Sequence, residues 1–62
     1  MKLYRINNLF GSAYISALEY VADYVKKNHN VNFTIKEHAS ELELIARVLE
    51  WKFNENGESV EE

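Results

Sequence analysis

The 62-residue sequence predicts a small, predominantly helical α+β domain in the order strand–helix–strand–helix. Three observations predict this class: a long segment with helical spacing of apolar residues, two short β-favouring runs, and two helix-start signals that precede a second helical segment. A domain of this length buries only about 60% of its unfolded surface, so its stability margin is thin. Because the sequence has no cysteine, neither disulfides nor a thiolate zinc site can reinforce it. Association with another protein chain is the remaining way to stabilise so small a domain.

The first predicted strand covers residues 3–6, a β-favouring run closed by Asn7 and Asn8. The first helix is expected to begin at Ser12, whose hydroxyl offers an N-cap, and to end near residues 28–30, where asparagine tolerates a left-handed conformation. Helical spacing places four of its apolar residues on one line: Tyr14, Leu18, Val21 and Val25.

The second predicted strand covers residues 31–35. Val31, Phe33 and Ile35 alternate there with polar residues, which is the periodicity of a strand. We expect this strand to pair with residues 3–6.

The second helix is preceded by two overlapping capping boxes, Thr34-x-x-Glu37 and Ser40-x-x-Glu43. A continuous helix from Ile35 to about Asn54 would be apolar on two opposite faces. One face would hold Ile35, Ala39, Leu42, Ala46, Leu49 and Phe53, and the other would hold Leu44, Val48 and Trp51. The alternative is a helix that breaks near Leu42 and resets its phase. The sequence leaves this choice open.

Charge divides the chain into a predicted compact domain, residues 1–54, and an acidic tail, residues 55–62. The tail carries four glutamates, a charge of −4, so the net charge of −3 leaves about +1 for the domain. Asn56-Gly57 is also a hairpin signal, and the alternative is a small β-wing that pairs residues 51–53 with residues 58–60.

Leu44, Val48 and Trp51 form the candidate protein interface. Tryptophan flanked by aliphatic residues on an exposed helix face is typical of an interaction hot spot. Alternatively, the N-terminal strand covers this face within one chain. The sequence therefore predicts a small non-enzymatic protein-binding or regulatory module, whose partner is a second copy in a homodimer or another protein.

Residues 34–57 carry a second interpretation. Residues 34–42 resemble the second helix of bacterial helix-turn-helix domains, in which a threonine cap and a small alanine precede a leucine. Residues 45–51, followed by Asn56-Gly57, are similar to the recognition helix and C-cap of winged-helix members, although the family's glycine-containing turn is missing. The resemblance implies a dimeric DNA-binding regulator.

That resemblance implies a nucleic-acid contact surface of Lys36, Arg47 and Lys52. Arg47 would contact a base or a phosphate, and Lys36 the DNA backbone. Glu43 and Glu50 lie beside these cations in the sequence and would repel phosphate, so nucleic acid is not the favoured partner.

The sequence offers no constellation that predicts catalysis, so we expect no enzyme, no cofactor and no metal. With only two glycines it has no glycine-rich phosphate loop, and no spacing assigns a base to any of its serines. His38 and Glu41, at i and i+3, supply at most half of a carboxylate-bridged metal site. The N-terminus does not resemble a signal peptide and no apolar run is long enough for a membrane span, so we expect a cytoplasmic protein without membrane contact.

Overall fold

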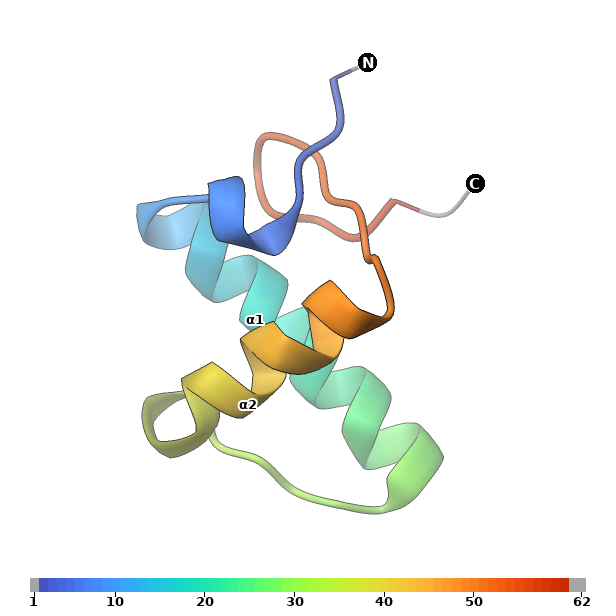
Figure 1. Cartoon of the computed structure of the whole chain (residues 1–62). Helices are drawn as coiled ribbons and strands as arrows, with labels where there is room; N and C mark the ends of the chain where they lie inside the picture. Colours follow the sequence, from blue (N-terminus) through green and yellow to red (C-terminus); the bar gives the residue numbers. More distant parts are fainter. Residues whose placement is uncertain (1, 61–62) are drawn as a thin grey trace.

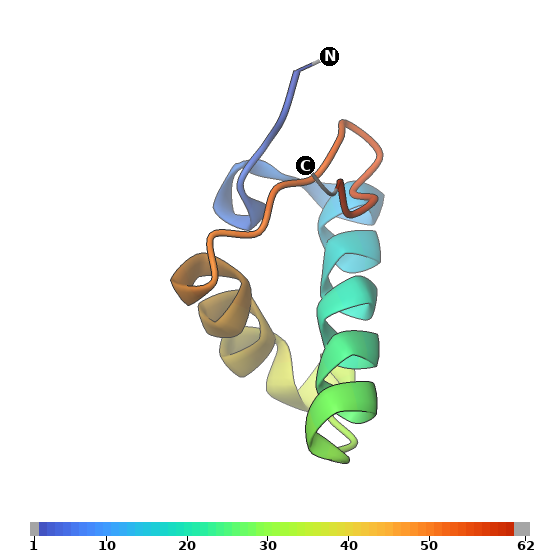
Figure 2. The same ribbon diagram turned by 90° about the vertical axis from the view of Figure 1, so that its right-hand side faces the viewer.

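A computed structural model of the chain describes residues 2–60. Its elements are a short 3₁₀ helix, η1 (Ile6–Asn8), and two α-helices, α1 (Gly11–His29) and α2 (Ile35–Val48). In Figure 1, α2 lies in front of α1 and crosses it. Figure 2 shows the helices diverging from the connection between them, with η1 and the C-terminal segment at the opposite, open end.

The fold is all-α, and the predicted α+β class is wrong. Among residues 2–60 no strand forms, and β pairing is limited to the isolated bridges Tyr4–Phe53 and Phe53–Ser59. Residues 31–34 are an irregular connection between the helices. They lie at the end of the molecule away from residues 3–6, so the expected pairing of these two segments is geometrically excluded (Figure 1).

The first predicted helix is confirmed. The predicted apolar line faces the core, with Leu18, Val21 and Val25 buried. Asn30 ends the helix at φ 53°, and its N–H donates to the Lys26 carbonyl at 3.1 Å, as expected of a left-handed C-cap. The start differs from the prediction, because α1 begins at Gly11 and no side chain caps it.

The second helix begins as predicted, with Thr34 at the N-cap, although its hydroxyl makes no capping hydrogen bond. Neither expected form of this helix is correct. The helix bends at His38 (φ −123°, ψ 22°) rather than near Leu42, and it ends at Val48 rather than near Asn54.

A Schellman motif closes α2. Glu50 adopts φ 56°, and its N–H donates to the Arg47 carbonyl at 3.2 Å. The N–H of Trp51 donates to the Ala46 carbonyl at 2.9 Å. These two bonds satisfy the last carbonyls of the helix and turn the chain away from the helix axis.

The core lies between the two helices and is closed at the open end by η1 and Phe53. Its buried residues come from every described element: Ile6, Leu9, Ala17, Leu18, Val21, Val25, Leu42, Ala46 and Phe53. Phe53 was expected on a helix, but it is fully buried from an extended segment, where its backbone bridges Tyr4 on one side and Ser59 on the other.

Residues 52–60 fold back on themselves through a turn at residues 54–57. The N–H of Asn54 donates to the Glu58 carbonyl at 3.0 Å, and the N–H of Val60 donates to the Lys52 carbonyl at 3.0 Å. The alternative of a reversal at Asn56-Gly57 is therefore found, but as one bridge rather than a β-wing. Gly57 is buried at φ 79°, where an added Cβ would lie 1.9 Å from the Ala13 carbonyl oxygen. This turn is packed on the first turn of α1.

Candidate protein-binding site

An apolar surface on the C-terminal half of α2 faces away from α1. Leu44 and Val48, at i and i+4, are 58% and 70% exposed. We call these two residues the outer face of α2. On the opposite side, Leu42 and Ala46 are buried against α1. A helix that is apolar on two sides can bury only one of them in a two-helix domain, and the outer face is the side left open.

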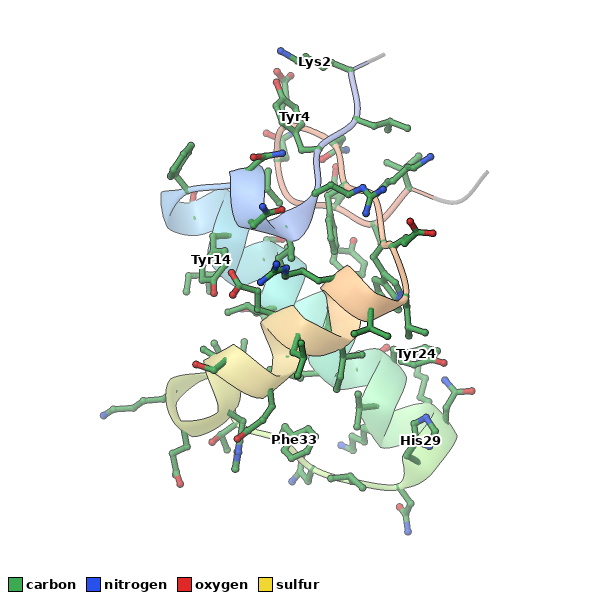
Figure 3. The ribbon with its side chains drawn as sticks, in the orientation of Figure 1. Lys2, Tyr4, Tyr14, Tyr24, His29 and Phe33 are labelled. Atoms are coloured by element: carbon green, nitrogen blue, oxygen red, sulfur yellow. The ribbon has the colours of Figure 1, made fainter. Side chains whose placement is uncertain are left out.

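Trp51 does not share this surface with Leu44 and Val48. Because α2 ends at Val48, Trp51 lies in the segment that turns back toward α1, where it is half-buried. Its ring packs edge-on against Tyr24 of α1, with ring centroids 5.2 Å apart and planes at 78°, and lies 6.1 Å from the Phe53 ring. Figure 3 shows Tyr24 on the second half of α1. The structure thus brings two of the three predicted interface residues together and places the third against α1.

Leu49 is 49% exposed, although sequence analysis placed it on the buried line of the helix, and it lies beside Arg5, Lys52 and Val60 rather than beside Leu44. Helical periodicity assigns it to the buried line with Leu42 and Ala46. In the structure it occupies the C-cap, with φ −84° and ψ 0°, immediately before the left-handed residue Glu50. Leu49 is exposed because the helix ends at Val48, and the sequence does not indicate that end.

Charged residues flank the outer face at both ends. Glu41, one turn before Leu44, contacts His38. The Nδ1 atom of His38 lies 2.6 Å from Oε2 of Glu41. The centroid of the His38 ring lies 4.8 Å from that of the Phe33 ring. Arg47 is exposed on the last turn, and within residues 2–60 no carboxylate lies within ion-pair distance of it. Glu41 thus lies before Leu44 and Arg47 after it, and Glu50, which follows Arg47, pairs with Arg5.

One polar contact holds the edge of α2 to α1. The Tyr14 hydroxyl donates to Glu43 Oε1 at 3.4 Å, and Figure 3 shows Tyr14 on the first half of α1 beside α2. Burial raises the pKa of the Tyr14 hydroxyl above its ordinary value of 10.0, and the charge and hydrogen bond of Glu43 raise it further. Glu43 therefore belongs to the contact between the helices and is not free to face a partner.

The predicted nucleic-acid residues occupy two elements. Lys36 is exposed on the first turn of α2, Arg47 is exposed on the last turn, and Lys52 is half-buried in the segment after the helix. α2 carries two basic residues, Lys36 and Arg47, and three glutamates, a charge of +2 − 3 = −1. Next to it, Glu50 pairs with Arg5 at 3.6 Å. The surface around these cations is therefore not electropositive.

Residues 2–60 contain no group of three or more histidine or acidic side chains placed to hold a metal ion. Neither described helix combines the length and the apolar character needed to cross a lipid bilayer.

Comparison of the chain with models of protein families, with curated proteins and with solved structures finds no match.

Proposed function

We propose that this chain is a small non-enzymatic protein-binding module, which acts by placing the outer face of α2 against another protein chain. The observation that supports it is the exposure of Leu44 and Val48, one turn apart on one side of α2. Scattered exposed apolar residues are ordinary on protein surfaces, whereas neighbouring ones on a helix are typical of a helix-mediated contact.

The energy available from this face supports only a weak, reversible contact. Burial of a fully exposed leucine or valine side chain contributes about 1.5–3 kcal/mol, and Leu44 and Val48 are already partly buried, so covering the rest supplies roughly 2–4 kcal/mol. Association costs an estimated 4–15 kcal/mol in lost translational and rotational freedom. The outer face therefore favours a weak, concentration-dependent complex, to which polar contacts at its edges must contribute.

Protein binding is favoured over DNA binding because of what surrounds Arg47. A helix presented to phosphate needs a surplus of positive charge, and α2 has a charge of −1. Its most exposed large side chain near Arg47 is Val48, which offers no hydrogen bond to a phosphate or a base edge.

The test is a valine-to-glutamate substitution at two exposed sites. Val48→Glu places a charge in the outer face, whereas Val31→Glu makes the same change at a 39% exposed position in the connection between the helices. Sedimentation velocity over a concentration series measures association of the chain with itself. Circular dichroism checks that both variants remain folded. We expect Val48→Glu to abolish association and Val31→Glu to leave it unchanged.

If both variants associate as the unchanged chain does, the outer face is not the contact surface. If Val31→Glu alone reduces association, the contact lies at the other end of the molecule and the proposal is wrong.

A further inference from the structure

We propose that Asn56-Gly57 is a site of spontaneous deamidation, and that packing of the turn at residues 54–57 on the first turn of α1 controls the reaction. The reactant is the chain itself, and the co-reactant is water. The inference does not depend on the proposed function, because it concerns a different segment of the chain.

The reaction joins two neighbouring groups of the chain. The backbone nitrogen of Gly57 attacks Cγ of the Asn56 side chain, and the new C–N bond closes a succinimide ring. The Cγ–Nδ2 bond breaks, and ammonia leaves with the proton that the Gly57 nitrogen carried. Water then adds to either ring carbonyl and opens the ring. The product is aspartate or, where the chain continues through Cγ, isoaspartate.

The sequence places this reaction at one dipeptide. Asparagine is among the chemically labile residues, and Gly57 is the only glycine that follows one, since Gly11 follows Phe10. Every other asparagine precedes a residue whose Cβ crowds the attacking nitrogen. Asn56 is exposed, so water reaches its side chain. In the unfolded chain, Asn56 therefore deamidates before the other asparagines.

The folded turn holds the attacking nitrogen in an unreactive position. The N–H of Gly57 donates to the Asn54 carbonyl at 3.0 Å, so the proton that must leave is held in a hydrogen bond. Gly57 is buried, which shields this proton from bases in the solvent. Ring closure also shifts Gly57, but an added Cβ there would lie 1.9 Å from the Ala13 carbonyl oxygen. Gly57 therefore has no room to move toward α1.

Asn54 keeps the turn closed. Its Oδ1 accepts the N–H of Asn56 at 2.9 Å and the N–H of Glu58 at 3.0 Å, and its Nδ2 donates to Glu58 Oε1 at 2.9 Å. Local segments of folded proteins open at free energies below that of global unfolding. Deamidation proceeds only from molecules in which this turn is open. Its rate in the folded chain is then the rate in the unfolded chain multiplied by the open fraction.

The isoaspartate product does not fit the closed turn. Its backbone passes through Cβ and Cγ and is one carbon longer between residues 56 and 57, so the Gly57 N–H is displaced from the Asn54 carbonyl. The freed α-carboxylate adds a negative charge between Glu55 and Glu58, which are both exposed. Because ammonia has been lost, the change is not reversed by reclosure. Deamidation therefore releases the turn from α1 in one direction only.

Deamidation rates in the folded and the urea-unfolded chain test this control. Mass spectrometry of proteolytic peptides follows conversion at residue 56, and chromatography separates the aspartate and isoaspartate products. At the same pH and temperature, we expect the folded chain to react at least about tenfold more slowly than the unfolded chain. Equal rates would overturn the proposal, because they would mean that the closed turn does not restrain Gly57. So would faster reaction at another asparagine of the unfolded chain.

Asn54→Ala opens the turn without changing either reacting residue. It removes the side-chain bonds to Asn56 and Glu58 and should accelerate deamidation of the folded chain about tenfold, with the rate in urea unchanged. Asn28→Ala is the matched control, since the Asn28 amide donates to the Tyr24 carbonyl at 2.9 Å near the C-terminus of α1. It should leave the rate unchanged. Equal acceleration by both variants would mean that the reaction passes through unfolding of the whole domain, and the role of the turn would be wrong.

Hydrogen exchange of the Gly57 amide measures the same opening directly. In Asn54→Ala, the exchange rate at Gly57 and the deamidation rate should rise by the same factor, because both require this N–H to leave its bond to the Asn54 carbonyl. Faster exchange without faster deamidation would show that opening of the turn does not control the reaction, and would overturn the inference.

Discussion

Replacement of Gly57 by alanine is expected to lower the free energy of unfolding by about 2–5 kcal/mol. Two effects add. At φ 79° the left-handed backbone costs a residue with a Cβ roughly 1–2 kcal/mol. The new Cβ would also lie 1.9 Å from the Ala13 carbonyl oxygen and 2.7 Å from its carbon, so the turn must move away from α1. Forced overpacking of this kind typically costs a further 1–3 kcal/mol.

Gly11→Ala is the matched control. Gly11 also has a positive φ, 58°, but an added Cβ there meets nothing within 4 Å. The control therefore has the cost of the left-handed conformation, and the same reduction in unfolded-chain entropy, without the collision. The difference between the two variants isolates the packing of the turn on α1, about 1–3 kcal/mol.

Urea unfolding followed by the fluorescence of Trp51, the one tryptophan, measures both variants. A domain of this size is stabilised by roughly 3–9 kcal/mol in total, so the difference is a large fraction of the whole. Equal destabilisation by Gly57→Ala and Gly11→Ala would refute the reasoning, because it would mean that residues 54–60 contribute nothing through their contact with α1.

Three further predictions follow from burial and charge. Leu42→Ala should lower the free energy of urea unfolding by about 2–5 kcal/mol, since Leu42 is fully buried, whereas Leu44→Ala should change it by less than about 0.5 kcal/mol; equal losses would contradict the assignment of faces. Trp51→Ala should cost about 2 kcal/mol in thermal unfolding, because it removes the ring that packs on α1, and should leave association unchanged; lost association without lost stability would return Trp51 to the interface. The raised pKa of Tyr14 stabilises the folded chain below pH 10, and this contribution disappears as the pH rises through the folded pKa. Tyr14→Phe should remove that part of the alkaline decline in stability, and an unchanged decline in alkaline denaturation curves would contradict it.

The sequence predicts α1 well because several local signals agree there. Four apolar residues share one line, cations occupy the last turn, and Asn30 tolerates the left-handed C-cap. No such agreement exists for residues 31–35. Alternation over five residues is compatible with a strand, but the same residues must connect the end of α1 to Thr34, the N-cap of α2.

The end of α2 is where prediction of the candidate site fails. Glutamate rarely adopts a positive φ, so nothing in the composition around Glu50 indicates that the helix stops there. A helix extended to Asn54 places Trp51 with Leu44 and Val48 and places Leu49 in the core, whereas the actual turn reverses both assignments. Tertiary contacts decide this turn, since Trp51 packs on Tyr24 and Phe53 bridges Tyr4.

A dilution series followed by NMR tests the central claim, that the outer face of α2 is a protein-binding surface, most directly. Amide resonances of residues 40–49 are predicted to shift as the concentration rises, and those of residues 31–34 at the other end of α2 to remain fixed. Shifts that fall instead on residues outside α2, or no shifts up to millimolar concentration, would contradict the account.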